Sequence, residues 1–307
     1  MRIVSLLPSA TEIACALGLE QALIGRSHEC DHPPAVRALP AVVRPLLELA
    51  GEDPLEIDRE VSRGLGAQGT LYAVDAEQLR ALAPDLVITQ DLCSVCAPAG
   101  EELQALVRTL PTPPRVLRLD PRTLEEVLAT VFQLGEAAGV PERAQALVAS
   151  LRARIQAVRQ RVAGAPRPGV VLLEWLDPIF DAGHWCPEMV ACAGGRELLG
   201  TAGAPSRRRS WDEVRAAAPE VLCLVPCGYH LEPVLAQAPR LCERPGYRDL
   251  PAVRAGRVYA CDADSYFARP GPRLVDGIEL LAHLLHPERC PWHGPADAFA
   301  PVPLATG

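Results

Sequence analysis

The chain has 307 residues, and its 49% hydrophobic and 22% charged residues are typical of a folded globular protein rather than a disordered or fibrous one. This length is too great for one ordinary core and predicts two domains of about 150 residues each. The net charge is −8 and all positive charge is arginine, spread along the chain without a basic cluster, so nucleic acid is not an expected partner.

The amino-terminal segment opens directly on a predicted strand, Arg2 to Leu7. Its apolar run is too short for a signal peptide, which predicts a cytoplasmic protein as written, or a periplasmic or cell-surface one if a leader was removed. Ser9-Ala-Thr-Glu12 has the pattern of a capping box and predicts a helix that ends near Gly18. No later stretch approaches the roughly 18 apolar residues of a membrane-spanning helix, so membrane insertion is not expected.

Helix and strand signals then alternate. A capped helix is predicted over residues 75–83, a buried parallel strand over 84–89 and another strand over 115–119. A helical region over residues 123–163, interrupted only at Gly139-Val-Pro141, is long enough to form a connecting spine.

Strand and helix patterns resume at Gly169 and continue to a helix over residues 272–285. The expected fold class is α/β, with two Rossmann-like lobes of mostly parallel sheet joined by a long connecting helix. The predicted division is an amino-terminal lobe over residues 1–120, a helical spine over 121–164, a carboxyl-terminal lobe over 165–290 and an irregular tail over 291–307.

The two predicted lobes partly repeat each other. Residues 75–89 align without a gap on residues 210–224, each segment reading as a capped helix followed by Ala-Pro-acid and a buried strand. Glu77 and Asp212 both fall at the second helical position, where a carboxylate complements the positive end of the helix.

Loops that follow parallel strands are expected to hold the ligand, because open α/β sheets bind beyond the carboxyl ends of their strands. These loops cover residues 27–34, 90–96, 175–186, 227–230 and 262–269. Their soft side chains suggest either a zinc or iron site or merely buried and exposed thiols and imidazoles. On the metal reading the ligands are His28, Cys30, Cys93, Cys96, His184 and Cys186.

The chain has 11 cysteines, an odd number scattered through helix and strand patterns, which does not resemble a disulfide scaffold. Reduced thiols are therefore expected. Cys93-Ser-Val-Cys96 lies between a strand and a helix, where redox chemistry is conceivable, but Pro98 follows too soon for a motif that opens its helix directly. Glu174 and Asp177 suggest a paired-carboxylate hydrolase, yet no nucleophile or oxyanion site accompanies them.

Aromatic residues are only 4% of the sequence and are concentrated on the same loops, where flat side chains can pack against a large flat ligand. Those predicted to do so are Trp175, Phe180, Trp185, Tyr229, Tyr266 and Phe267. Arg269 could pair with a carboxylate, amide or phosphate of the ligand, or form an ordinary surface salt bridge. Glycine-rich nucleotide-binding motifs do not occur, so nucleotide binding has no support.

The residues resemble a known family, the substrate-binding proteins of cobalamin and iron-siderophore ABC importers, and most closely its cobalamin-binding branch. The resemblance covers most of the chain. It rests on Arg2-Ile-Val-Ser-Leu-Leu-Pro-Ser-Ala-Thr-Glu12, Asp31-His-Pro-Pro34, the repeated Ala-Pro-acid segments after Glu77 and Ser210, and Tyr266-Phe-Ala-Arg-Pro-Gly-Pro-Arg273.

The resemblance implies two α/β lobes that hold the ligand between them and dock on a permease through one surface acid per lobe. Glu77 and Asp212 match those acids. Where cobalamin-binding relatives tend to carry aromatics facing the corrin, this chain has Glu29, Leu71 and Glu174, with Tyr72 and Trp175 one position further along.

The expected function is therefore non-enzymatic binding of cobalamin or a related corrinoid, for ABC-type import or intracellular handling, with no cofactor required. The alternative is a protein that binds zinc, iron, haem or an iron chelate through its His and Cys loops, and a remote alternative is a metal- or thiol-dependent enzyme. The expected ligand contacts are His28, Glu29, Cys30, Tyr72, Asp91, Cys93, Cys96, Trp175, Phe180, His184, Trp185, Cys186, Tyr229, Tyr266, Phe267 and Arg269.

Overall fold

The structure is a computed structural model that describes residues 1–47, 53–68, 71–90 and 101–303. The chain divides into two compact units, one formed by Met1–Pro121 with Val127–Ala149 and the other by Arg122–Glu126 with Ser150–Gly307. Each unit contains a mostly parallel sheet flanked by helices, which confirms the predicted α/β class. Among the described helices, none combines the length and the apolar character needed to cross a membrane.

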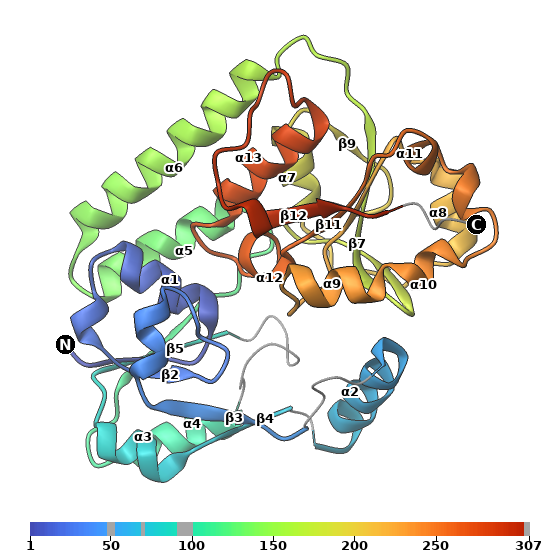
Figure 1. Cartoon of the computed structure of the whole chain (residues 1–307). Helices are drawn as coiled ribbons and strands as arrows, with labels where there is room; N and C mark the ends of the chain where they lie inside the picture. Colours follow the sequence, from blue (N-terminus) through green and yellow to red (C-terminus); the bar gives the residue numbers. More distant parts are fainter. Residues whose placement is uncertain (48–52, 69–70, 91–100, 304–307) are drawn as a thin grey trace. The chain divides into compact units, whose positions relative to one another are not determined.

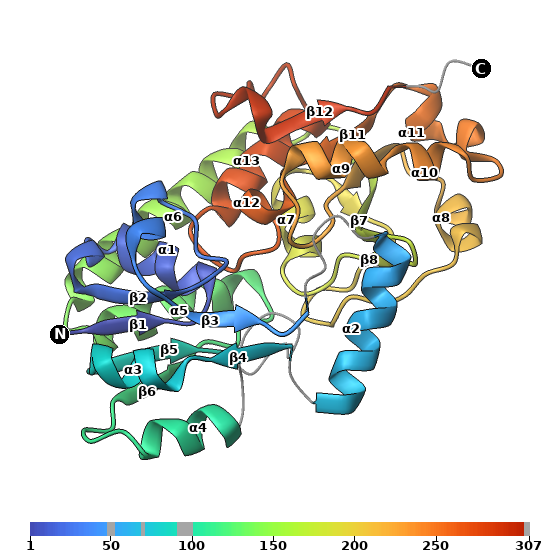
Figure 2. The ribbon, with the colours of Figure 1, turned by 60° about the horizontal axis from the view of Figure 1, so that its bottom comes forward.

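The sheet of the first unit is mostly parallel. Its strands are β1 (Ile3–Ser5), β2 (Leu23–Ser27), β3 (Ala41–Pro45), β4 (Tyr72–Val74), β5 (Leu86–Thr89) and β6 (Arg115–Arg118). They pair in the order β4-β3-β2-β1-β5-β6, and only the pairing of β4 with β3 is antiparallel among these described strands (Figure 1). The helices are α1 (Pro8–Ala16), α2 (Pro54–Gln68), α3 (Ala76–Leu82) and α4 (Glu101–Arg108). The sheet lies between α1 on one face and α3 and α4 on the other (Figure 2).

Helix α1 begins two residues earlier than its sequence pattern predicted. Pro8 takes the first helical position, where its fixed φ suits the helix, and Leu7 is the N-cap without a side-chain cap bond. Ser9 and Glu12 are buried inside the helix, so the predicted capping box is wrong. The predicted end is confirmed, because the helix stops at Ala16 and Gly18 adopts a left-handed φ of +70°.

The predicted spine consists of two helices, α5 (Leu124–Ala137) and α6 (Pro141–Arg161), separated by a turn in which Gly139 has a φ of +73°. Helix α6 is 21 residues long, which corresponds to roughly 30 Å at the usual rise per residue. The division between the units falls within both helices, so the spine is shared between them rather than forming a separate domain.

The second unit has a mixed sheet. Its strands are β7 (Gly169–Leu176), β8 (Ile179–Asp181), β9 (Arg196–Glu197), β10 (Val221–Leu224), β11 (Val258–Cys261) and β12 (Phe299–Pro301). The main order is β12-β11-β10-β7-β8, and β9 also pairs with β7. The two outer strands, β12 and β8, are antiparallel to their neighbours, while β7, β9, β10 and β11 pair in parallel.

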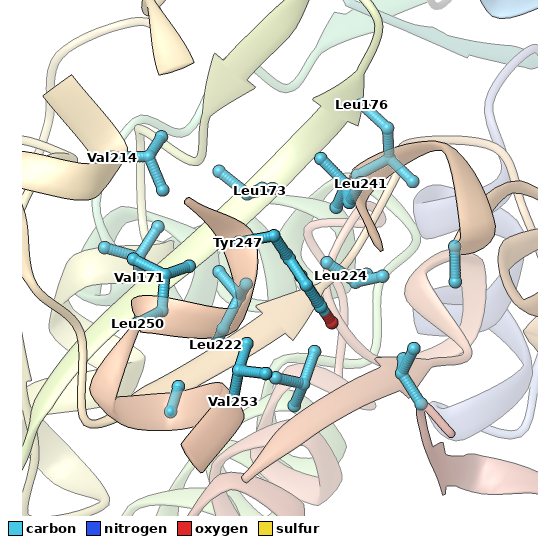
Figure 3. Close-up of a cluster of buried hydrophobic side chains, with 14 of the residues drawn as sticks. Val171, Leu173, Leu176, Val214, Leu222, Leu224, Leu241, Tyr247, Leu250 and Val253 are labelled. Carbon is cyan, nitrogen blue, oxygen red and sulfur yellow. The ribbon is translucent and has the colours of Figure 1, made fainter. Parts of the chain in front are cut away.

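Short helices surround this sheet. They are α7 (Cys186–Cys192), α8 (Trp211–Ala217), α9 (Leu231–Gln237), α10 (Pro239–Cys242), α11 (Pro251–Arg254), α12 (Ala263–Tyr266) and α13 (Leu274–Leu285). On one face, alternate residues of β7 and β10 pack with α8, α10 and α11 around the Tyr247 ring (Figure 3). The side chains labelled there are Val171, Leu173, Leu176, Val214, Leu222, Leu224, Leu241, Tyr247, Leu250 and Val253.

The tail after residue 290 is more ordered than the sequence predicted. Phe299–Pro301 forms β12, which pairs with β11, and the Phe299 ring lies 6.1 Å edge-on from Tyr259. The prediction of an irregular tail is therefore wrong for this strand. Three residues containing a proline are too few to show the alternation by which strands are recognised.

The internal repeat is present in the structure. Helix α3 and strand β5 have the same lengths as α8 and β10, and all four boundaries are offset by 135 positions. Asp75 caps α3 by accepting from the Gln78 N–H, and Ser210 caps α8 in a complete capping box with Glu213. The repeat inferred from the sequence is confirmed.

Candidate ligand-binding site

The first unit gathers three predicted contacts beside the carboxyl end of β2. His28 and Glu29 follow β2 directly, and Tyr72 begins β4, which is antiparallel to β3 and therefore starts at the same edge of the sheet. The Tyr72 hydroxyl donates to Glu29 Oε1 at 3.3 Å, and the Tyr72 and His28 rings have their centroids 5.5 Å apart. The structure therefore brings these three residues together within one unit.

The surroundings of His28 favour a neutral imidazole. Burial lowers the pKa of His28 and the charge of Arg26 lowers it further, while a hydrogen bond involving the Val43 backbone opposes both effects. Nε2 of His28 lies 3.7 Å from Glu29 Oε1. A neutral imidazole can accept a hydrogen bond or bind a metal, so His28 suits a polar contact to a ligand.

Arg26 shapes this loop, and the sequence analysis did not identify it. Its guanidinium donates to the carbonyl oxygens of Ser27 at 2.9 Å and His28 at 3.0 Å. It also donates to the carbonyl oxygens of Leu39 and Arg37, each at 3.1 Å. One side chain thus ties together the two ends of the connection from β2 to β3, a role that an arginine in an alternating strand does not reveal by itself.

Cys30 lies behind this group rather than on its surface. The side chain is 1% exposed, and the hydroxyl of the buried Thr11 donates to its sulfur at 3.0 Å. Cys15, also on α1, lies near enough for Cys30 to contribute to its raised pKa, although burial is the larger cause. These contacts favour a packing role for the Cys30 thiol against α1.

In the second unit, an aromatic pair forms where β7 and β10 end. The rings of Trp175 and Tyr229 are tilted with their centroids 5.6 Å apart, and Trp175 Nε1 donates to the Asp177 carbonyl at 3.1 Å. Both side chains are partly exposed. A partly exposed aromatic pair at the carboxyl edge of a parallel sheet offers a flat apolar surface to a ligand.

A polar cluster that the sequence analysis did not identify lies at the ends of β10 and β11. His230 Nδ1 lies 3.0 Å from Asp262 Oδ1, and Asp262 also accepts from the Ser265 N–H and hydroxyl at 3.0 and 2.7 Å. Burial alone would raise the pKa of Asp262, but these hydrogen bonds hold it below its ordinary value, so the carboxylate is charged. The loops themselves were predicted, and the pairing within them was not.

Arg269 belongs to the same cluster. Its guanidinium donates to both carboxylate oxygens of Asp264, and only 8% of its side chain is exposed. Nε2 of His230 lies 3.7 Å from the same carboxylate. Arg269 therefore neutralises a neighbouring acid within the unit, and its predicted contact with a ligand remains a proposal.

In the second unit, four predicted aromatic or thiol contacts, Trp185, Cys186, Tyr266 and Phe267, are less than a tenth exposed. Trp185 Nε1 donates to the Phe267 carbonyl at 2.8 Å, the Cys186 sulfur lies 4.0 Å from the same oxygen, and Tyr266 packs edge-on against Trp292. This burial favours a role in supporting the loops. Phe180 is partly exposed instead and lies under the Arg208 guanidinium at 5.5 Å.

The predicted metal ligands divide between the units, with His28 and Cys30 in the first and His184 and Cys186 in the second. Burial raises the pKa of Cys186 well above its usual value, with neighbouring carboxylates adding to the effect. His184 is partly buried with a left-handed φ of 51°, and burial lowers its pKa. Asp91, Cys93 and Cys96 lie outside the described residues.

The nine cysteines in the described part of the chain are all free thiols, in agreement with the reduced state expected. Most of them are buried, as is usual for cysteines that act as small apolar side chains. The cysteine count therefore reflects core packing in these residues rather than a disulfide framework.

The two predicted docking acids occupy equivalent surface positions. Glu77 and Asp212 are each the second residue of a seven-residue helix, α3 and α8, and both are exposed. The Asp212 side chain is 86% exposed and pairs with Arg215 at 3.1 Å on the same helix. The structure thus gives each unit one exposed acid at the same place in the repeat.

Comparisons with known proteins agree with this fold. Relatives include the vitamin B12-binding protein of Vibrio cholerae, 25% identical over 92% of this chain and 88% of the relative. An uncharacterized ABC transporter substrate-binding lipoprotein of Bacillus subtilis is 25% identical over 94% and 80%. The apo structure of a periplasmic haem-binding protein from Roseiflexus is 26% identical with a TM-score of 0.69, covering 93% of this chain and 98% of that one.

The family comparison covers most of the chain. The family model described as periplasmic binding protein matches residues 3–265, which include every strand of both sheets apart from β12. The resemblance seen in the sequence is therefore confirmed. The chain belongs to the periplasmic binding protein family.

Proposed function

We propose that the protein binds a corrinoid, cobalamin or a close relative of it, as the substrate-binding component of an ABC-type importer. The observation that carries this proposal is the partly exposed pair of Trp175 and Tyr229 at the carboxyl edge of the second sheet, bordered by the polar cluster around His230. A flat apolar surface with polar groups at its rim suits a large macrocycle that carries amide side chains. Similarity to a vitamin B12-binding protein over most of both chains supports the choice of a corrin.

Haem is the second candidate ligand. A haem-binding relative with a TM-score of 0.69 supports it, as does the group of His28, Glu29 and Tyr72, which offers an imidazole and a phenol at one edge. Both ligands are flat and metal-centred, so the same kinds of side chain, aromatic rings and an imidazole, favour either of them.

Binding rather than catalysis fits the candidate carboxylates of the second unit. Glu174 accepts from the Ser206 hydroxyl at 2.7 Å, and Asp177 pairs with Arg244 at 3.3 Å. Carboxylates that already hold structural partners are less suited to the paired acid and base roles of a hydrolase. The named relatives are binding proteins, which supports the same conclusion.

We also propose that the protein acts outside the cytoplasmic membrane. The expectation of a cytoplasmic protein gains no support, because the matching family is described as periplasmic and one relative is a lipoprotein. Export would place the ligand site where an importer collects its substrate.

Titration with cobinamide, cyanocobalamin, haemin and zinc, each followed by visible spectroscopy and calorimetry, tests the ligand. We expect both corrinoids to bind with dissociation constants below about 1 μM, equivalent to at least about 8 kcal/mol. Tighter binding of haemin than of either corrinoid would replace the corrinoid by haem. Tight zinc binding without any response to the macrocycles would contradict the proposal altogether.

We propose further that Glu77 and Asp212 dock on paired arginines of the importer's permease. A Glu77→Ala/Asp212→Ala variant should bind corrinoid normally and lose most of its affinity for the permease in lipid nanodiscs. A control variant, Glu136→Ala/Asp249→Ala, removes one exposed acid from each unit at positions outside the repeat and should retain that affinity. Equal permease binding by the two variants would remove Glu77 and Asp212 from the proposal.

A further inference from the structure

Arginines of the second unit gather at the amino-terminal edge of its sheet, opposite the edge that carries the candidate ligand-binding loops. Two of them lie in the last turn of α6, and one begins β9, which pairs with the start of β7. Two others lie just before β7 and β11, and the last follows α13. The arginine cluster consists of Arg159, Arg161, Arg167, Arg196, Arg257 and Arg289. These residues come from separate segments, so the sequence shows no basic run.

The turn after α7 lies at the centre of the arginine cluster. Arg167 donates to the Gly195 carbonyl in this turn at 2.9 Å. A Cβ added at Gly194 would lie 2.9 Å from both Val162, just after α6, and His286, just after α13. The carboxyl-terminal ends of α6, α7 and α13 therefore meet at one place, and each brings arginines with it.

Several of these guanidinium charges act on the same neighbouring side chains. Burial lowers the pKa of His286, and the charges of Arg257 and Arg289 lower it further, while a backbone hydrogen bond opposes both effects. Burial raises the pKa of Cys290, and the charges of Arg161 and Arg289 oppose that rise. The arginines thus form one local region of positive charge.

Part of this charge has an ordinary structural role at the helix ends. Arg257 donates to the last two carbonyls of α13 at 3.1 and 3.0 Å, and Arg289 donates to two carbonyls at the end of α6 at 3.4 and 3.1 Å. A helix end carries only about half an elementary negative charge. Three such ends therefore compensate only part of the positive charge of six guanidiniums.

Carboxylates offset little of what remains. In the part of the chain that the structure describes, the six side chains contact carbonyl oxygens and one sulfur, and none forms an ion pair with a carboxylate. Glu188 and Glu220 border the cluster, but each already accepts from a backbone N–H at 2.6 Å. Glu288 is exposed beside Arg289. All the arginines except Arg257 are exposed, so the excess positive charge faces solvent.

We infer that the arginine cluster binds the anionic headgroups of a phospholipid bilayer. Guanidinium groups form paired hydrogen bonds with phosphate oxygens. Groups of about four to eight basic residues are typical of protein surfaces that bind anionic lipids. Binding through the cluster does not depend on which ligand the protein carries, and it leaves the loops at the opposite edge of the sheet open to solvent.

The surface lacks features that other anionic partners require. Among the described residues, the exposed large hydrophobic side chains are Met1 and Leu46, and both belong to the first unit. A protein interface usually has an apolar centre, and single-stranded nucleic acid stacks on aromatic rings. A bilayer needs neither, because its headgroups form a continuous anionic layer. Since the net charge of the chain is −8, the rest of the surface would be repelled and the cluster would orient the protein.

Sedimentation with lipid vesicles tests this surface. At low salt we expect the protein to bind vesicles that contain phosphatidylglycerol and not vesicles of phosphatidylcholine alone. Roughly 0.5 M NaCl should abolish the binding, because it shortens the Debye length to a few ångströms. Binding to both kinds of vesicle alike would contradict recognition of anionic headgroups.

Two double variants with the same change in net charge separate the cluster from the overall charge. Arg161→Glu/Arg196→Glu removes no side-chain hydrogen bond among the described residues and should bind the anionic vesicles at least about tenfold more weakly. Arg108→Glu/Arg207→Glu, at exposed positions outside the cluster, should bind nearly as the unmodified protein does. Thermal unfolding shows whether both variants remain folded. If charge reversal disturbs the fold, Arg161→Gln/Arg196→Gln removes the charges more mildly and should also weaken binding.

Several outcomes would overturn the proposal. Equal losses in the two charge-reversal variants would mean that net charge governs binding, and a protein that ignores phosphatidylglycerol vesicles at low salt has no such surface. Tighter binding of duplex DNA than of vesicles in the same buffer would assign the cluster to nucleic acid. Saturable binding of inorganic phosphate that prevents vesicle binding would reduce the cluster to a site for a single anion.

Discussion

The two copies of the internal repeat share their construction. In both, a seven-residue helix ends at an alanine with a left-handed φ, 40° at Ala83 and 46° at Ala218, and a proline and an acid lead into a buried strand. The acid has the same task twice, since Asp85 accepts from the Arg2 N–H at 2.7 Å and Glu220 from the Gly169 N–H at 2.6 Å. The scaffold is therefore duplicated down to individual hydrogen bonds.

The loops beyond the strands are not duplicated. Strand β1 leads directly into α1 at Pro8, whereas β7 leads into a hairpin with β8 and reaches α7 only at Cys186. Strand β10 ends in the turn that carries Tyr229 and His230. The repeat therefore supplies the frame of each unit, while the chemistry depends on loops that differ between the units.

We expect the largest effect on stability from shortening one buried side chain in each copy of the repeat, the helix residue that packs in the core of its own unit. Leu79 and Val214 occupy equivalent positions, both are fully buried, and each packs in the core of its own unit. Leu79→Ala should destabilise the first unit by roughly 2–5 kcal/mol, and Val214→Ala should destabilise the second by a smaller amount because fewer methyl groups are lost.

Native-state hydrogen exchange distinguishes the two units in this experiment. Leu79→Ala should accelerate exchange of the β5 amides more than those of β10, and Val214→Ala should do the reverse. Equal acceleration of both strands by either variant would mean that the two cores unfold as one cooperative structure, and the comparison of separate units would fail.

A buried carboxylate that the second unit adds beside β7 should give the next largest effect. Glu197, on β9, is partly buried, one of its carboxylate oxygens is shielded from solvent and has no hydrogen-bond partner among the described residues, and burial raises its pKa from 4.5 to about 7. Because the pKa is higher in the folded state than in the unfolded state, protonation of Glu197 favours folding. This contribution to stability is fully present below pH 4.5 and is lost as the pH rises through 7.

Glutamine does not ionise, so the Glu197→Gln variant should keep the stability that the unmodified protein loses above neutral pH. At pH 8 we expect the variant to be more stable by roughly 2–3 kcal/mol, with little difference at pH 4.5. Urea unfolding at both pH values measures this. Glu288→Gln, an exposed position in the same unit, serves as the control, and a Glu197→Gln benefit that does not depend on pH would contradict the raised pKa.

The sequence predicted features that depend on neighbouring residues and missed those that depend on strand pairing. The caps at Asp75 and Ser210 and the buried strands after them are local patterns, so both copies of the repeat were predicted correctly. The three-residue strands β8 and β12 are too short to show alternation.

The candidate site was predicted at the level of loops rather than contacts. His230 and Asp262 are 32 residues apart in sequence, and they meet because β10 and β11 pair in parallel and end at the same edge. Trp185 and Cys186 lie in a loop that follows a strand, where a ligand contact is expected. Both are nevertheless buried, and both lie against the carbonyl of Phe267, which is about 80 residues away in the sequence. No local pattern contains these long-range contacts, so the sequence could not rank the loop residues by exposure.

The smallest effect tests the two left-handed alanines, where the copies agree most closely. An alanine in this conformation has its Cβ too near the backbone, whereas glycine has no such conflict. Ala83→Gly and Ala218→Gly should each stabilise the protein by about 0.5–1 kcal/mol, because the relief of strain exceeds the added flexibility of the unfolded chain. Ala81→Gly and Ala216→Gly, at exposed positions inside the same helices, should instead destabilise it by about 1 kcal/mol. Hydrogen exchange of β5 and β10 measures all four variants, and a loss of stability at position 83 or 218 as large as at 81 or 216 would show that the shared turn carries no strain.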